Sequence, residues 1–164
     1  MNPIKSCVLA ACLPLALSAP VTSARAAETV TEPAAPAYDA ALAQRLGADE
    51  MGMRPYVLVI LRTGPTRVPD GEARKAMFAG HFANMERLAK EGKLALAGPF
   101  SEDPAGWRGL LLLAVDDLEE AKRLTATDPV IVNGEMVAEY HRWYGSAAAM
   151  LIPEVHDRLA KKSP

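Results

Sequence analysis

The order of strand and helix patterns between residues 55 and 144 constrains the fold of this chain more than any other feature. Residues 56–62 are an apolar run rich in β-branched side chains, bounded by Pro55 and by Gly64-Pro65, and they predict a strand. Residues 93–100 and 107–115 predict two more strands, and the turn-forming residues 101–106 between them predict a hairpin. Residues 135–144 predict a fourth strand, and helical patterns fill the two remaining gaps.

Both predicted helices carry end signals. Asp70 is expected to cap the first helix, which runs to about Glu91 and stops at Gly92. Asp116 or Asp117 is expected to cap the second, which ends before Pro129 because proline disfavours helical backbone in the residue before it. The resulting order, β-α-β-β-α-β, is the ferredoxin-like arrangement, so the predicted fold class is α+β.

The strands are apolar on both sides, which bears on assembly. An open sheet with helices on one face usually shows a polar pattern on the other, yet residues 57–61 and 110–113 are apolar throughout. A second copy packed sheet on sheet would cover the second face, so we expect a homodimer. The alternative is that the C-terminal segment from Ala147 folds across that face.

The first 26 residues are expected to be a secretory signal peptide. Lys5 precedes an apolar run at residues 7–21, and Ala24-Arg25-Ala26 supplies the small residues that a signal peptidase requires. The run is too short and too interrupted by proline for a membrane span. Leu9-Ala10-Ala11-Cys12 also resembles a lipobox, which would place a lipid on Cys12. We expect export to the periplasm or the exterior with cleavage near Ala26, which removes both cysteines of the chain.

The rest of the chain divides into three parts. Residues 27–53 are expected to be a leader or linker that includes a short helix at 38–46. Residues 54–146 are the predicted ferredoxin-like domain, and residues 147–164 are a C-terminal helical tail. The balance of 18 Lys and Arg against 20 Asp and Glu, net −2, argues against nucleic acid as a partner.

His81 and Asp128 are the candidate catalytic residues. His81 lies in the apolar stripe of the first predicted helix, where a histidine is either a general base or a core residue bonded to a backbone carbonyl. Asp128 precedes Pro129 at the exit of the second helix, a position where aspartate is also an ordinary turn residue. In the predicted fold the two helices cover the same face of the sheet, so Asp128 can approach His81 and orient its imidazole.

Four further residues are candidates for binding a small-molecule ligand. Glu139, His141 and Trp143 alternate along the last strand and therefore share one face, which lines either a cleft or a dimer interface. Ser101 stands where the second strand enters a turn. No HxH or HExxH spacing and no phosphate-binding glycine pattern occurs, so we expect no metal and no cofactor, haem included.

Residues 54–145 resemble the YCII-related (YciI-like) proteins, small members of the dimeric α+β barrel superfamily. The resemblance rests on the order and spacing of six stretches: Gly80-His81-Phe82-Ala83-Asn84-Met85, residues 91–100, Arg108-Gly109-Leu110, residues 118–121, Thr127-Asp128-Pro129 and residues 139–145. It implies a barrel made of two sheets, and in each protomer a cleft with a His–Asp centre, which His81 and Asp128 match. A few relatives carry out lyase chemistry such as dehydrochlorination of aromatic-derived compounds, and muconolactone isomerases share the superfamily. The signal peptide departs from the usual cytoplasmic member.

Two functions remain open from the sequence. The first is an exported enzyme that uses the His81–Asp128 pair for general acid–base chemistry on a small molecule, of isomerase or lyase type. The second is a non-catalytic module that uses the same cleft only to bind a small ligand. An open pocket at His81 with a carboxylate within hydrogen-bond reach favours the first function, and a packed, dry site favours a core histidine without a chemical role.

Overall fold

The computed structural model describes residues 37–162 of the chain. The predicted signal peptide, its cleavage site, the lipobox cysteine and residues 27–36 of the predicted leader lie outside the described residues. In the part that the structure describes, no helix is both long enough and apolar enough to cross a membrane.

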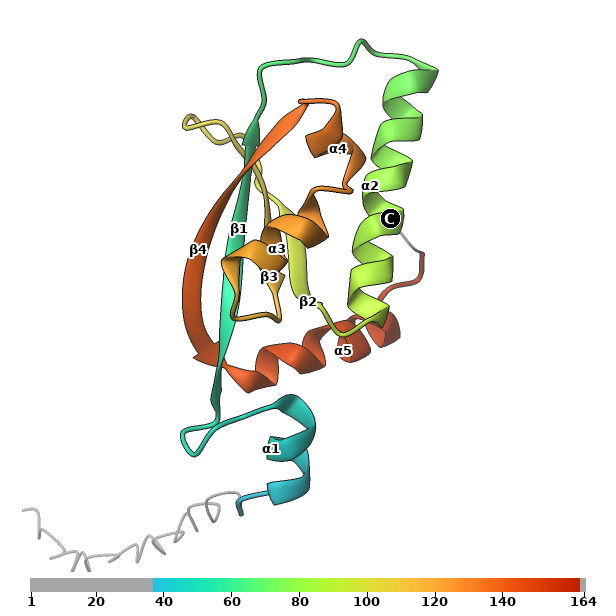
Figure 1. Cartoon of the computed structure of the whole chain (residues 1–164). Helices are drawn as coiled ribbons and strands as arrows, with labels where there is room; N and C mark the ends of the chain where they lie inside the picture. Colours follow the sequence, from blue (N-terminus) through green and yellow to red (C-terminus); the bar gives the residue numbers. More distant parts are fainter. Residues whose placement is uncertain (1–36, 163–164) are drawn as a thin grey trace, which may run out of the picture. The chain divides into compact units, whose positions relative to one another are not determined.

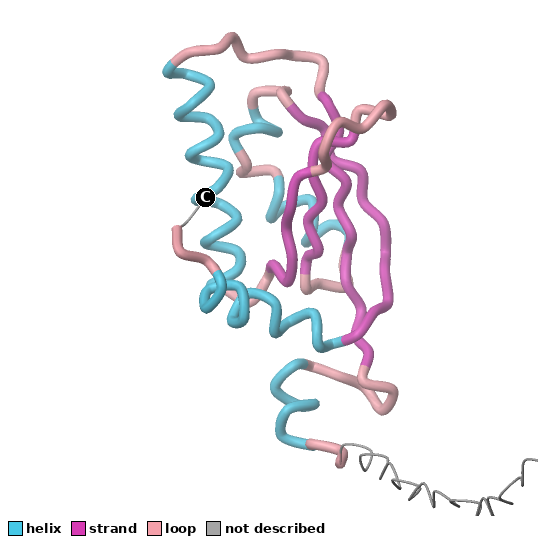
Figure 2. The backbone as a smooth tube through the Cα atoms, turned by 180° about the vertical axis from the view of Figure 1, so that it is seen from behind, coloured by secondary structure: helices cyan, strands magenta, loops and turns pink. Residues whose placement is uncertain are grey.

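Four antiparallel strands form one sheet in the order β2-β3-β1-β4 (Figures 1 and 2). The strands are β1 at Met53–Thr63, β2 at Leu94–Pro99, β3 at Trp107–Leu113 and β4 at Met136–Ser146. The long strand β1 lies in the middle, where Val57 pairs with Leu113 of β3 and with Arg142 of β4. With the intervening helices, this order confirms the predicted α+β, ferredoxin-like arrangement.

Three helices cover one face of the sheet, and the chain continues beyond it at both ends (Figure 1). These three are α2 at Glu72–Lys90, α3 at Leu118–Thr125 and α4 at Pro129–Val132. The short helix α1 at Ala40–Leu46 precedes β1 and ends at Gly47, whose φ of 66° is left-handed, as expected of a C-terminal cap. After β4 come a 3₁₀ helix, η1, at Ala147–Leu151 and the helix α5 at Ile152–Leu159.

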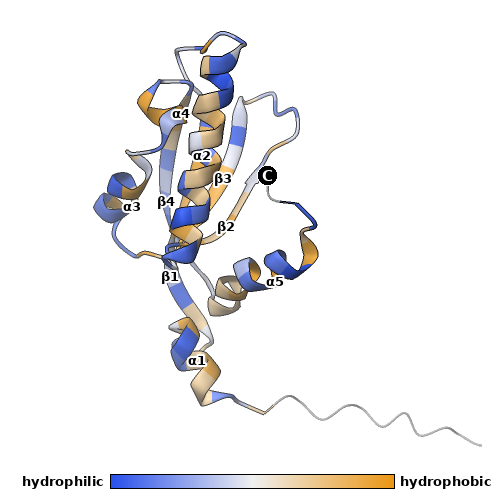
Figure 3. Cartoon of the chain, turned by 90° about the vertical axis from the view of Figure 1, so that its right-hand side faces the viewer, coloured by the Kyte–Doolittle hydropathy of each residue, from blue (hydrophilic) through white to orange (hydrophobic). Residues whose placement is uncertain are grey.

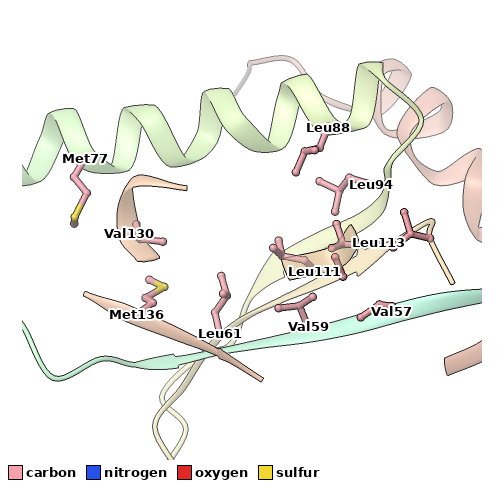
Figure 4. Packing of buried hydrophobic residues seen from close by; sticks show 12 residues of the cluster. Val57, Val59, Leu61, Met77, Leu88, Leu94, Leu111, Leu113, Val130 and Met136 are labelled. Carbon is pink, nitrogen blue, oxygen red and sulfur yellow. The ribbon is translucent and has the colours of Figure 1, made fainter. Parts of the chain in front are cut away.

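The main core lies between the sheet and α2 (Figure 4). Because side chains alternate along a strand, Val57, Val59 and Leu61 of β1 all point to this face. Leu111 and Leu113 of β3 extend the layer, and the helices close it with Met77, Leu88, Ala121 and Val130. Figure 3 shows the contrast between the apolar β3 and the hydrophilic outer surface of α3. Each large side chain buried here contributes about 1.5–3 kcal/mol relative to an exposed one.

The opposite face of the sheet is covered at one end by the chain itself. Ala149 and Met150 of η1 pack on a smaller buried cluster that contains Tyr56, Leu112 and Ala114. The alternative in which the C-terminal segment folds across this face is therefore correct for that end of the sheet. Four large apolar side chains of this face nevertheless stay between 38% and 44% exposed: Leu96, Trp107, Val137 and Trp143.

The structure corrects the predicted start of the first long helix. Gly71, not Asp70, is the N-cap of α2, and it makes no side-chain cap hydrogen bond. The Asp70 carboxylate instead pairs with Arg67 at 3.2 Å and with Arg74 at 3.4 Å. These two ion pairs engage the carboxylate that was expected to accept a hydrogen bond from a backbone N–H in the first turn of the helix. At α3 the expectation is confirmed, because Asp117 accepts from the backbone N–H groups of Glu119 and Glu120.

Helix α4 was not predicted. It has four residues and starts at Pro129, directly after the predicted end of the preceding helix. Proline is favoured at the first position of a helix, and Asp128 caps this one by accepting from Val130 N–H. The turn between α3 and α4 places Asp128 over α2 rather than at a free helix exit.

Candidate functional site

His81 occupies the middle of α2 on the side that faces α4. Its side chain is only 9% exposed. The ring of Phe78 meets the imidazole edge-on with centroids 6.3 Å apart, and the ring of Phe82 lies 5.6 Å away at 49°. His81 thus belongs to the apolar stripe of the helix, as its spacing predicts, and it needs a polar partner there.

Asp128 is that partner. Its Oδ2 lies 2.7 Å from His81 Nδ1, and the residue is 1% exposed. The same oxygen accepts from Asn84 Nδ2 at 3.3 Å, and Oδ1 accepts from Val130 N–H at 3.1 Å. The buried carboxylate therefore has three donors, two from α2 and one from the backbone of α4, which satisfies the requirement that buried charges be hydrogen-bonded.

The close approach of α2 and α4 depends on Gly80. A Cβ atom at this position would lie 2.8 Å from Pro129 Cγ, closer than van der Waals contact allows. The glycine lets the proline ring rest on the helix backbone, one residue before His81 and one residue after Asp128. The packing of Pro129 on Gly80 and the hydrogen bond between Asp128 and His81 therefore belong to one contact between α2 and the start of α4.

Replacing Gly80 by alanine is expected to destabilise the protein although alanine is the better helix former. The gain in helix propensity is about 1 kcal/mol, whereas overpacking against a rigid ring costs about 1–3 kcal/mol. Urea denaturation should therefore show a net loss, with Ala79→Gly on the exposed side of the same helix as a control for the propensity difference. A stabilised Gly80→Ala variant would show that Pro129 does not press on α2.

The contact with Asp128 selects the tautomer of a neutral His81. An ionised carboxylate only accepts, so against it a neutral imidazole carries the hydrogen on Nδ1 and has a free lone pair on Nε2. Within the described residues, His81 Nε2 has no protein hydrogen-bond partner. Among the fully buried side-chain nitrogens and oxygens of these residues, only Arg54 Nε lacks a partner, so Nε2 is not one of the fully buried atoms. His81 Nε2 therefore keeps some contact with solvent. An imidazole held through Nδ1 with Nε2 open is the arrangement of a general base.

A second ion cluster lies farther toward the N-terminus of α2. Glu135 is 2% exposed and accepts from Arg74 Nη2 at 2.7 Å, and Arg108 Nη1 is 3.8 Å away. The hydrogen bond from Arg74 holds the pKa of Glu135 below its ordinary value, although burial acts in the opposite direction. Arg74 also lies over the ring of Phe78, 5.0 Å from its centroid, so the cluster contacts the same aromatic side chain as His81.

The other predicted site residues lie apart from the His81–Asp128 pair. Glu139, His141 and Trp143 share one face, as their alternation predicts, but it is the face of the sheet without α2. Glu139 pairs there with Arg62 at 2.6 Å, and the ring of Trp143 lies 5.5 Å from that of Tyr56. Ser101 is exposed in the turn between β2 and β3. These four residues remain candidates for ligand binding only on surfaces separate from His81.

Two surface cavities of the described part of the chain are lined by residues other than His81 and Asp128. One of about 390 Å³ lies beside Arg54, Lys93, Asp116 and Glu120, and another of about 210 Å³ lies beside Tyr56, Arg142 and Trp143. The described residues contain no group of three or more His, Cys, Asp or Glu side chains placed to hold a metal ion.

Asn84, which donates a hydrogen bond to Asp128, is the site residue that was not predicted from the sequence. It stands three residues after His81, a spacing that places both side chains on the same side of a helix. That spacing was available in the sequence as a signal, but it acquires a meaning only once Asp128 is known to lie against this part of α2.

Comparison with known proteins identifies the family. Residues 53–143 match the model of the YCII-related domain. The uncharacterized protein YjpA of Bacillus subtilis (strain 168) is 35% identical over 65 residues, which are 40% of this chain and 73% of YjpA. Among solved structures, the 5-chloro-2-hydroxyhydroquinone dehydrochlorinase TftG from Burkholderia phenoliruptrix AC1100, in complex with 2,5-dihydroxybenzoquinone, aligns at 21% identity and a TM-score of 0.40. That alignment covers 53% of this chain and 92% of TftG. The match to the family model over residues 53–143 shows that the chain belongs to the YCII-related family.

Proposed function

We propose that this protein is a small-molecule enzyme in which His81 acts as general acid and base and Asp128 orients it. One observation carries the proposal: the 2.7 Å contact between His81 Nδ1 and a buried, fully hydrogen-bonded carboxylate, which leaves Nε2 open. A core histidine bonded to a backbone carbonyl would need no buried aspartate. Burying a carboxylate is costly, so its presence beside His81 favours a chemical role.

The proposed step is a proton transfer without an oxidant or a reductant. His81 Nε2 removes a proton from a carbon or hydroxyl of the bound molecule, and the imidazolium is stabilised by Asp128 through the Nδ1–H bond. In an isomerisation the same proton returns to a different atom of the substrate. In an elimination the substrate electrons expel an anion, and the proton leaves His81 for solvent. Both reactions balance with the residues present.

The surroundings of the imidazole favour a small ligand with an apolar or aromatic part. Phe82, whose ring lies 5.6 Å from that of His81, is 39% exposed and offers an aromatic surface beside the imidazole. A ligand that reaches Nε2 would cover this ring and remove apolar surface from water.

A ligand screen tests the proposal. Unsaturated lactones serve as probes, because they carry carbon-bound acidic protons, which exchange slowly without a catalyst, on a small planar frame. Binding is followed by the ¹⁵N resonances of the histidine side chains, and His81→Ala is screened beside the wild type. The proposal expects at least one probe that shifts His81 Nε2 and exchanges its acidic proton with solvent in the presence of the protein. Ligands that bind only at other residues would contradict it.

The alternative function, a module that only binds a ligand, is favoured by one observation. Both described cavities lie away from His81, and the larger one is lined by four charged side chains. In that case, a probe would bind beside Arg54 or Trp143 and undergo no proton exchange. The same screen therefore separates the two functions.

We further propose that the protein is a homodimer joined through the helix-free face of the sheet. The partly exposed Leu96, Trp107, Val137 and Trp143 support this, because the pairing of the strands places all four on the helix-free face. Sedimentation at micromolar concentration should give about twice the monomer mass. A folded monomer under these conditions would exclude the dimer.

Export is proposed from the sequence of the first 26 residues. Mass spectrometry of the protein recovered from cells should find Ala27 at the N-terminus. An intact Met1 in the cytoplasm, or a lipid on Cys12, would contradict cleavage near Ala26.

A further inference from the structure

Asn84 connects the His81–Asp128 pair to the surface of α2. Its Nδ2 donates to Asp128 Oδ2 at 3.3 Å, the same oxygen that lies 2.7 Å from His81 Nδ1. A neutral amide donor holds the carboxylate without cancelling its charge. A lysine or arginine in the same place would compete with the imidazole for that charge.

Arg87 determines which end of the Asn84 amide faces Asp128. Arg87 Nη2 donates to Asn84 Oδ1 at 2.8 Å, and Arg87 Nη1 is held by both carboxylate oxygens of Glu91 at 2.9 Å. Arginine offers only donors and an ionised carboxylate only acceptors, so the amide can satisfy both neighbours in one orientation alone. Its oxygen must face Arg87 and its NH₂ group must face Asp128.

We propose that Asn84 is a positioning residue that fixes the Asp128 carboxylate and thereby the Nδ1–H tautomer of His81, with Arg87 fixing the amide. The inference rests on the proposed function, since it assigns Asn84 a role in keeping Nε2 free to accept a proton. Without Asn84, each carboxylate oxygen keeps a single protein donor, His81 for Oδ2 and Val130 N–H for Oδ1, and the orientation of the carboxylate is held less firmly. The Nδ1–H tautomer would then lose part of its stabilisation.

The ratio of the two neutral imidazole tautomers measures this effect. ¹⁵N chemical shifts of labelled histidine distinguish Nδ1–H from Nε2–H at alkaline pH, where the imidazole carries no charge. Wild type should show the Nδ1–H form of His81 in excess. In Asn84→Leu, which is similar in size and cannot donate, we expect this ratio to fall by about tenfold, equivalent to about 1.4 kcal/mol for one hydrogen bond to a charged group.

Asn133 provides the matched control. Its Nδ2 donates to the backbone carbonyl of Pro129 at 2.7 Å, so it holds α4 without touching the Asp128 carboxylate. Asn133→Ala should loosen α4 and leave the tautomer ratio unchanged. An equal fall in Asn133→Ala and Asn84→Leu would overturn the proposal, because general loosening of α4 would then explain both.

Arg87 supplies a second test that does not depend on how well Asn84→Leu folds. Its side chain is 46% exposed, so substitution should be tolerated. Arg87→Leu should lower the ratio in the same direction by less than Asn84→Leu, and Arg87→Lys, which keeps a donor for Oδ1, should restore it. An unchanged ratio in folded Asn84→Leu, or in Arg87→Leu if the first variant does not fold, would overturn the proposal.

The positioning role of Asn84 and the catalytic role of His81 can be disproved separately. If the tautomer ratio responds to Asn84 as expected but no probe exchanges its proton at His81, the positioning role stands and the proposed function is wrong. If His81 exchanges protons and the ratio ignores Asn84, the function stands and the positioning role is wrong.

Discussion

Replacing His81 by glutamine is expected to slow the protein-dependent proton exchange of a bound probe by about 10²- to 10⁴-fold, the usual contribution of a positioned general base. Glutamine has a similar length, and its amide NH₂ can donate to Asp128 in place of Nδ1–H, so the carboxylate keeps its partner. It has no basic nitrogen, so the proton acceptor is lost. The rate is read from the loss of the probe proton signal in D₂O by NMR.

His156 offers the matched control for this experiment. It is an exposed histidine on α5, and within the described residues its side chain makes no hydrogen bond or ion pair. His156→Gln removes one imidazole from the protein and should leave the exchange rate unchanged. Equal rates in His81→Gln and wild type, or an equal loss in both variants, would show that proton transfer does not occur at His81.

Replacing Asp128 by alanine is expected to lower the free energy of unfolding by about 2–4 kcal/mol. The change leaves the donors of His81, Asn84 and Val130 without their acceptor, and each buried unsatisfied donor costs about 1–3 kcal/mol, less where water can enter. The loss of the N-cap of α4 adds about 1 kcal/mol. The midpoint and slope of urea denaturation measure the difference.

Two variants distinguish the loss of the buried hydrogen-bond acceptor from the loss of the helix cap. Asp128→Asn retains an oxygen that can cap α4 and should be less destabilising than alanine. Asp117→Ala removes the N-cap of α3, where the carboxylate accepts only from two exposed backbone N–H groups, and should also cost less than Asp128→Ala. If Asp128→Ala cost no more than Asp117→Ala, Asp128 would act as a helix cap alone and its bond to His81 would be weak.

The order of elements could be predicted because each long segment has a clear apolar pattern and clear boundaries. Strand β1 stands out as a continuous apolar run between Pro55 and Gly64-Pro65, and helix α2 stands out by its helical period over 19 residues. Helix α4 has four residues, too few for any period, and the sequence marks it only by the Asp128-Pro129 dipeptide. Because α4 was not predicted, the sequence did not explain how Asp128 reaches the middle of α2.

The faces of the sheet show a second limit of sequence reasoning. Alternation correctly placed Glu139, His141 and Trp143 on one side of the last strand, but the side that the helices cover depends on tertiary packing. The same holds for the C-terminal segment, since the pattern after Ala147 does not show that Ala149 and Met150 pack on Tyr56 and Leu112. Likewise, the cap at Asp70 was wrong because Arg67 and Arg74 hold that carboxylate.

A crystal structure of the protein with a bound probe would decide whether the His81–Asp128 pair carries the chemistry. The proposed mechanism predicts the acidic proton of the probe on an atom about 2.6–3.2 Å from His81 Nε2, with the probe against Phe82 and the Nδ1–Asp128 contact intact. A probe bound in the cavity beside Arg54, with His81 Nε2 facing only water or protein, would contradict it.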